Sequence, residues 1–163
     1  MLRNDYILRL ADQIAAAFTE LLLEGKPGWL AEATQSCHEL CRQHVGLELD
    51  TVLRLAPEGL RQLLRQAGAA GIAKSAVLAE VLLVHAQLAG QRGDRAVLVA
   101  SHVHAFHLLR EMTPWVDASA LGAHERKLET AADQLRELGL ESYVGIELAR
   151  PIGDADSTPR PSA

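Results

Sequence analysis

The chain has 163 residues, enough for one domain to bury a core without disulfides or metal ions. Hydrophobic residues make up 48% of the chain and aromatic residues only 4%, and the prevalence of Ala and Leu favours helices over strands. The formal charge of -5 argues against nucleic-acid binding, because that function needs a basic surface.

The N-terminal region shows no targeting signal. The apolar run at residues 13–19 is too short to span a bilayer, and charged residues among the first twelve positions interrupt the pattern of a signal peptide. We therefore expect a cytoplasmic protein without a membrane partner. Cys37 and Cys41 are expected to be reduced thiols, because two cysteines four residues apart do not form a disulfide framework.

In chain order, the first predicted helix covers residues 4–23, where apolar residues recur at helical spacing. Gly25, Pro27 and Gly28 end it. A second amphipathic helix is predicted at residues 29–44, and Gly46 closes it.

The middle of the chain begins with Asp50, which caps a short turn, and Pro57, which suits the first turn of another helix. Residues 67–71 are predicted to form a loop. Residues 78–91 and 94–112 then both show helical periodicity, and we expect them to form an antiparallel helical hairpin. Gly93 is the helix stop and Asp94 the helix start between them.

The C-terminal region contains a final long helix, which the Thr113-Pro114 step is expected to start and Gly139 to stop. Residues 141–150 suit a helical turn or a strand, and we favour the helix. Residues 151–163 are polar and rich in Pro, so they are predicted to be disordered.

The hairpin resembles a tetratricopeptide repeat. Ala86 and Ala89 occupy positions where small residues let paired helices approach, and Ala105 follows Gly93 after twelve residues.

A second resemblance covers roughly residues 4–112. The opening Asn-Asp-Tyr-Ile-Leu-Arg at residues 4–9, Gly46-Leu47, and Leu-Ala-Pro-Glu at residues 55–58 resemble an uncharacterised bacterial family, a domain of unknown function with tetratricopeptide-like helices. The resemblance implies an all-α array of antiparallel helical hairpins and carries over no catalytic residue. Our predicted organisation is one all-helical domain, residues 1–150, followed by the disordered tail.

One candidate metal site lies in the second predicted helix. Cys37, Cys41 and His44 follow an i, i+4, i+7 spacing, which would present two thiols and an imidazole suitable for zinc on one face. The alternative is that both cysteines are small core residues, since free cysteine is among the most buried residue types.

A second candidate metal site lies in residues 102–107, which contain three histidines. His104 and His107 share a helical face with Glu111, and Glu80 or His85 on the neighbouring helix would add a ligand. One alternative is a half-exposed face whose imidazoles bond to water or carboxylates, and another is an interface that responds to pH.

The sequence contains no Gly-flanked nucleophile, catalytic triad or phosphate loop, so it favours a protein without catalytic residues or a cofactor. One charged pattern remains, a stripe of basic residues. It is either a solvated helix face or a docking site for an acidic peptide. Its members are Arg54, Arg61 and Arg65.

The sequence thus favours a noncatalytic helical module that binds a protein or peptide partner through an apolar groove. We expect the first helix to mediate a homodimer through an apolar stripe, with core packing within one chain as the alternative. The residues of this stripe are Ile7, Leu10, Ile14 and Phe18. The competing function is a metal-binding helical protein that uses His104, His107 and Glu111.

Overall fold

The predicted all-α class is confirmed. The computed structural model describes residues 2–152, with side chains described from Arg9 onward, and this part of the chain forms eight α-helices and no strand. They are α1 (Leu2–Glu24), α2 (Trp29–Leu40), α3 (Leu49–Arg54), α4 (Pro57–Gln66), α5 (Ala69–Arg92), α6 (Arg95–Met112), α7 (Ala118–Glu137) and α8 (Glu141–Ala149). A π-helical turn at Cys41–Val45 continues α2, and a 3-10 turn at Thr113–Trp115 follows α6. The predicted disordered tail lies, from residue 153 on, outside the described residues.

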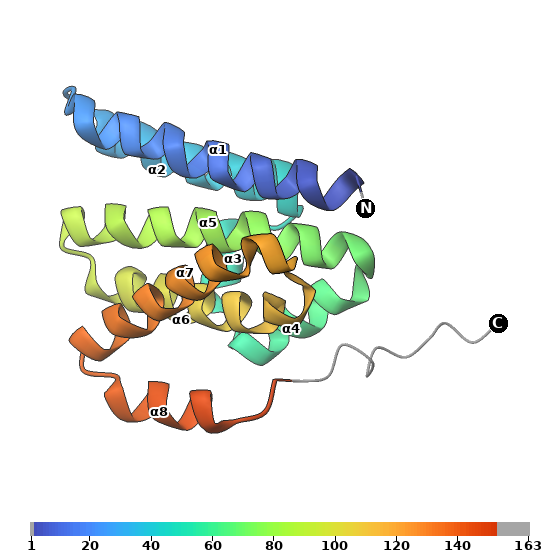
Figure 1. The fold of residues 1–163 in the computed structure, drawn as a ribbon. Coiled ribbons are helices and arrows are strands. Elements are labelled where there is room, and N and C mark those ends of the chain that lie inside the picture. The colour runs from blue at the N-terminus through green and yellow to red at the C-terminus, as the bar shows by residue number, and fades with distance from the viewer. Residues whose placement is uncertain (1, 153–163) are drawn as a thin grey trace.

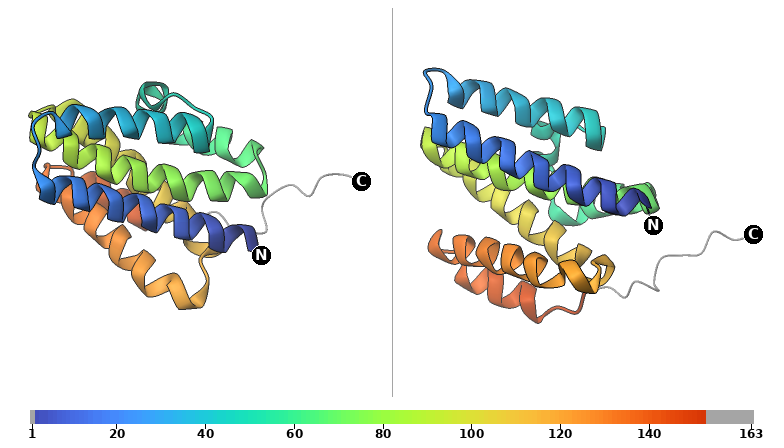
Figure 2. Two further views of the ribbon diagram at one scale, coloured as in Figure 1. Left: turned by 90° about the horizontal axis from the view of Figure 1, so that it is seen from above. Right: turned by 45° about the horizontal axis from the view of Figure 1, so that its top comes forward.

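The helix α5 lies at the centre of the structure, with helices packed on opposite sides of it (Figure 1). The helices α1 and α2 run alongside each other over α5, as the view from above shows (Figure 2). On the other side α6 packs along α5, α7 packs on α6, and α8 packs on α7 as the outermost helix. The short helices α3 and α4 contact α6, and α4 also contacts α5.

One cluster of buried apolar side chains holds these layers together, because every one of the eight helices contributes to it. By length and composition alone, α5 is also apolar enough to cross a membrane. However, 67% of its most apolar window is buried by other helices of the same chain, which is the position of a core helix.

The junction between α5 and α6 follows the sequence prediction. Gly93 adopts a left-handed conformation with a φ of 72° and ends α5. The Asp94 side chain accepts a hydrogen bond of 3.2 Å from the backbone N–H of Val97 and so caps α6. Because Asp94 satisfies an amide that the first helical turn leaves free, the chain can reverse within two residues.

Two predicted boundaries are wrong. Residues 67–71 do not form a loop throughout, because α5 already begins at Ala69 and includes Gly71. The long helix α7 does not start at Pro114, which lies in the 3-10 turn, but at Ala118 after Asp117. Residues 141–149 form a helix, as favoured.

The apolar stripe of α1 faces the core of its own chain. Ile14 and Phe18 are buried in the central cluster, and Leu10 packs against that cluster while partly buried. The side chain of Ile7 lies outside the described part of the structure. At Ile14 and Phe18, the structure therefore shows the core packing that was the alternative to a dimer surface.

Candidate functional site

An open apolar groove of about 680 Å³ runs along the N-terminal half of α6. Its base is a stripe of small and β-branched side chains on α6, spaced three or four residues apart. These are Ala96, Val99, Ala100 and Val103. Leu55 and Pro57 line the groove from the α3–α4 turn, and Arg95 and His104 also line it.

The wall of the groove follows from local sequence. Pro57 is the first residue of α4, where its missing N–H costs no helical hydrogen bond. The residue before a proline is pushed to extended geometry, and Ala56 has a φ of -65° and a ψ of 149°. Leu55 is extended as well, with a ψ of 145°. These extended residues end α3 and hold Leu55 and Pro57 against the α6 stripe.

His104 is a buried member of the groove lining, with 3% of its surface exposed. Burial lowers its pKa below the usual histidine value and nearby His107 acts in the same direction, whereas hydrogen bonding to the backbone of Leu55 and Leu53 opposes this shift. Its Nδ1 atom has no hydrogen-bond partner in the described part of the chain. At neutral pH this side chain is therefore a neutral imidazole.

His107 points to a different neighbour, the helix α8. Its Nε2 atom lies 2.5 Å from the hydroxyl oxygen of Tyr143, and the two rings meet nearly edge to face. Burial lowers the pKa of His107, while the charge of Glu147 on α8 raises it. His107 therefore joins α6 to α8.

Glu111 forms ion pairs with α4. Its carboxylate oxygens lie 2.9 Å from Arg61 and 3.2 Å from Arg65, and Arg61 also binds Glu58. Two residues of the predicted basic stripe thus pair with acidic side chains of the same chain.

The structure does not bring the predicted metal ligands together. His104 faces the α3–α4 turn, His107 faces α8 and Glu111 faces α4. Glu80, offered as a further ligand, is buried and bound at 2.6 Å by Lys127 of α7, which also lies 3.6 Å from Asp12 of α1. Within residues 9–152, no group of three or more His, Cys, Asp or Glu side chains is arranged to hold a metal ion.

His85, the other predicted additional ligand, lies on α5 like Glu80 but packs against His38 rather than against α7. It is buried, and its ring meets that of His38 at a centroid distance of 5.7 Å. Burial lowers the pKa of His85 to about 4, and the charges of Arg92 and His38 add to the shift.

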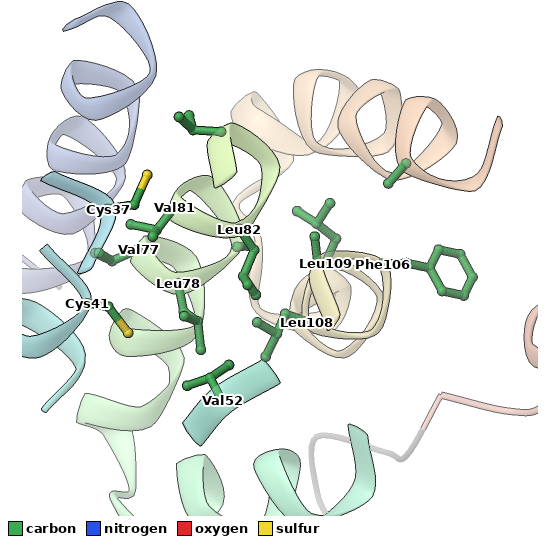
Figure 3. Close-up of a cluster of buried hydrophobic side chains, with 14 of the residues drawn as sticks. Cys37, Cys41, Val52, Val77, Leu78, Val81, Leu82, Phe106, Leu108 and Leu109 are labelled. Carbon is green, nitrogen blue, oxygen red and sulfur yellow. The ribbon is translucent and has the colours of Figure 1, made fainter. Parts of the chain in front are cut away.

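The predicted zinc face on α2 is divided between core and surface. Cys37 and Cys41 are fully buried against α5, close to Val77 and Leu78 (Figure 3). Burial raises the pKa of Cys37 to about 12 and that of Cys41 to about 11, so both remain thiols. His44 is exposed.

A π-helical turn explains the position of His44. The backbone N–H of Gly46 donates to the carbonyl of Cys41, five residues back, at 3.1 Å. The wider turn rotates His44 off the face that an ordinary α-helix would have given it. The core packing of both cysteines was the alternative interpretation of this pattern.

Two polar contacts were not predicted from the sequence. His124 of α7 is buried, and its Nε2 atom lies 2.7 Å from the carbonyl oxygen of Leu109 and 3.1 Å from the Thr113 hydroxyl. It satisfies a carbonyl in the last turn of α6, a common role for a polar side chain near a helix end. No spacing in the sequence signals this pairing, nor that of Lys127 with Glu80.

Comparison with models of known protein families, with curated proteins and with solved structures gives no match to this chain. The functional proposal therefore rests on the geometry of the chain itself.

Proposed function

We propose that this protein is a noncatalytic module, built as a tetratricopeptide-like arrangement of helical hairpins, that binds a helix of a partner protein in the α6 groove. The observation that carries the proposal is the open apolar stripe of α6, bounded by Leu55 and Pro57. Helical arrays use such surfaces between their helices to bind helices or peptides without special catalytic residues.

The intramolecular contacts of α6 indicate which occupant suits this face. Further along the same stripe lie His107, which contacts Tyr143 of α8, and Arg110, which contacts the carbonyl of Arg150 directly after α8. The open half of the stripe is therefore continuous with a surface that already accepts a helix. Because the stripe is apolar and residues spaced three or four apart share a helix face, the matching occupant is an amphipathic helix.

Self-association through α1 is not part of this proposal, because Ile14 and Phe18 pack within their own chain. A metal-dependent function is not proposed either. The predicted ligands His104, His107 and Glu111 contact different neighbours, namely the α3–α4 turn, α8 and α4.

The test uses a displayed library of amphipathic helical peptides, selected against the full chain. We expect enriched peptides whose binding perturbs the NMR signals of Val99, Ala100 and Val103. Ala100→Arg places a long charged side chain in the groove and should weaken binding at least tenfold, because it fills the space of the occupant and buries an unpaired charge. Ala123→Arg, on the exposed surface of α7, is the matched control and should change affinity less than twofold.

Two results would overturn the proposal. One is a library that yields no peptide above the background of an unrelated helical protein. The other is an enriched peptide whose affinity is equally insensitive to Ala100→Arg and Ala123→Arg.

A further inference from the structure

The face of α6 that carries the groove is longer than the groove. Ala96, Ala100, Val103, His107 and Arg110 follow one another at spacings of three or four residues, so they form one continuous stripe. Only the half from Ala96 to Val103 lines the groove. In the other half, His107 contacts Tyr143 of α8, and Arg110 donates a hydrogen bond to the carbonyl of Arg150, directly after α8.

The attachment of α8 rests on few contacts. Val144 is fully buried, but the hydrogen bonds on the α6 side join polar groups: Tyr143 with His107, and the Arg110 guanidinium donating to the Arg150 carbonyl. Leu140, the N-cap residue of α8, provides no side-chain hydrogen bond to the first turn of that helix.

Two large apolar side chains of α8 are exposed. Ile146 is 60% exposed and Leu148 is 43% exposed. Consequently, Ile146 and Leu148 would gain little further exposure if α8 detached, and Val144 is the fully buried apolar side chain that release of the helix would expose. Gly139, with a φ of 88°, lies in the link to α7.

We propose that α8 is a displaceable cover, and that its release doubles the length of the helix-binding face on α6. At a rise of 1.5 Å per residue, the open stripe from Ala96 to Val103 is about 10 Å long and the stripe to Arg110 is about 20 Å long. The covered protein thus accepts about two turns of a partner helix and the uncovered protein about four. The effect of this cover on partner binding rests on the proposed function of the groove. The release of α8 itself does not depend on that function.

Hydrogen exchange of the full chain, measured with increasing subdenaturing urea, tests the release directly. Amides of α8 should exchange through a local opening that is at least tenfold more frequent than the opening of α5 and that depends only weakly on urea. Val144→Ala removes buried carbon atoms from the α8 contact and should make this opening about tenfold more frequent.

Ile146→Ala is the matched control. It shortens a branched aliphatic residue on the same helix, but at a largely exposed position, so it should leave the opening of α8 within about twofold of the wild type. Exchange of α8 and α5 amides with the same free energy and the same urea dependence would overturn the proposal. Equal effects of Val144→Ala and Ile146→Ala would overturn it as well.

A binding measurement tests whether release of α8 lengthens the helix-binding face. The ligand is a peptide that was enriched against the groove and then extended by two helical turns toward Arg110. Its affinity should rise up to about tenfold in Val144→Ala and stay unchanged in Ile146→Ala, because the competent state becomes more populated. An affinity equal in both variants would overturn the regulatory role. Failure to select any peptide would count against the groove and leave the hydrogen-exchange result to decide whether α8 is displaceable.

Discussion

Gly71 offers the sharpest test of how α4 and α5 pack. A Cβ atom at this position would lie 1.9 Å from the carbonyl oxygen of Leu64 and 2.9 Å from its carbonyl carbon. Both are backbone atoms in the last turns of α4, so no side-chain rotation relieves the clash. Gly71→Ala therefore requires α4 to move away from α5.

The expected cost has two opposing terms. Overpacking of this kind costs about 3 kcal/mol, the upper end of the usual range, because backbone must shift. The change from Gly to Ala within a helix returns about 1 kcal/mol. The net loss in the free energy of unfolding is about 2 kcal/mol, which lowers Tm by roughly 4–8 °C in a chain of this size.

Urea and thermal unfolding, followed by circular dichroism, measure this loss. Gly59→Ala in α4 is the control, since a Cβ there meets nothing within 4 Å, and it should raise the free energy of unfolding by about 0.5–1 kcal/mol. A Gly71→Ala variant as stable as Gly59→Ala would refute the close approach of Leu64 to α5.

Three further predictions concern buried polar groups. The pKa of His85 in the folded protein, about 4, is below its ordinary value, so stability is present above about pH 6.5 and is lost as pH falls toward 4. Urea titrations should show a loss of about 2 kcal/mol between pH 7 and pH 5, and His85→Leu should flatten that slope. Cys37 and Cys41 should resist a thiol reagent at pH 8 and react at once in urea, and fast labelling of the folded protein would contradict their burial. Lys127→Met leaves the buried Glu80 carboxylate without its cation and should lower the free energy of unfolding by about 1–3 kcal/mol at pH 7, a loss that Glu80→Gln in the same chain should largely restore.

Features that depend on a few adjacent residues could be predicted from the sequence. Gly93 and Asp94 end one helix and start the next through their own backbone and side-chain chemistry. Pro57 starts α4 for the same kind of local reason. Such signals do not need the rest of the chain.

Boundaries set by contacts between helices could not be predicted in this way. Gly71 looks like a loop residue in the sequence, but it lies within α5, at a position where α4 comes so close that a Cβ would clash with the Leu64 carbonyl. Pro114 looks like a helix start, but it lies in a 3-10 turn before Asp117 and α7.

The neighbours of the predicted metal ligands could not be read from the sequence for a related reason. Sequence spacing places His104, His107 and Glu111 on neighbouring positions of one helix, but it does not show which helices pack beside them. The chain supplies other partners for two of them: Arg61 for Glu111, and Tyr143 for His107. An apolar groove was expected, but its position was not predicted, because Leu55 and Pro57 reach α6 only through the tertiary fold.

The two halves of the α6 stripe differ in the size of their side chains. The covered half presents His107 and Arg110, long polar side chains that form hydrogen bonds with Tyr143 of α8 and with the Arg150 carbonyl directly after it. The open half presents Ala96 and Ala100, which keep little bulk between the α6 backbone and an occupant. Because the distance between helix axes depends on the side chains at the contact, a partner helix can lie closer to the open half than α8 lies to the covered half. Selected peptides should therefore carry small residues where they face Ala96 and Ala100, and polar residues only where they extend beyond Val103.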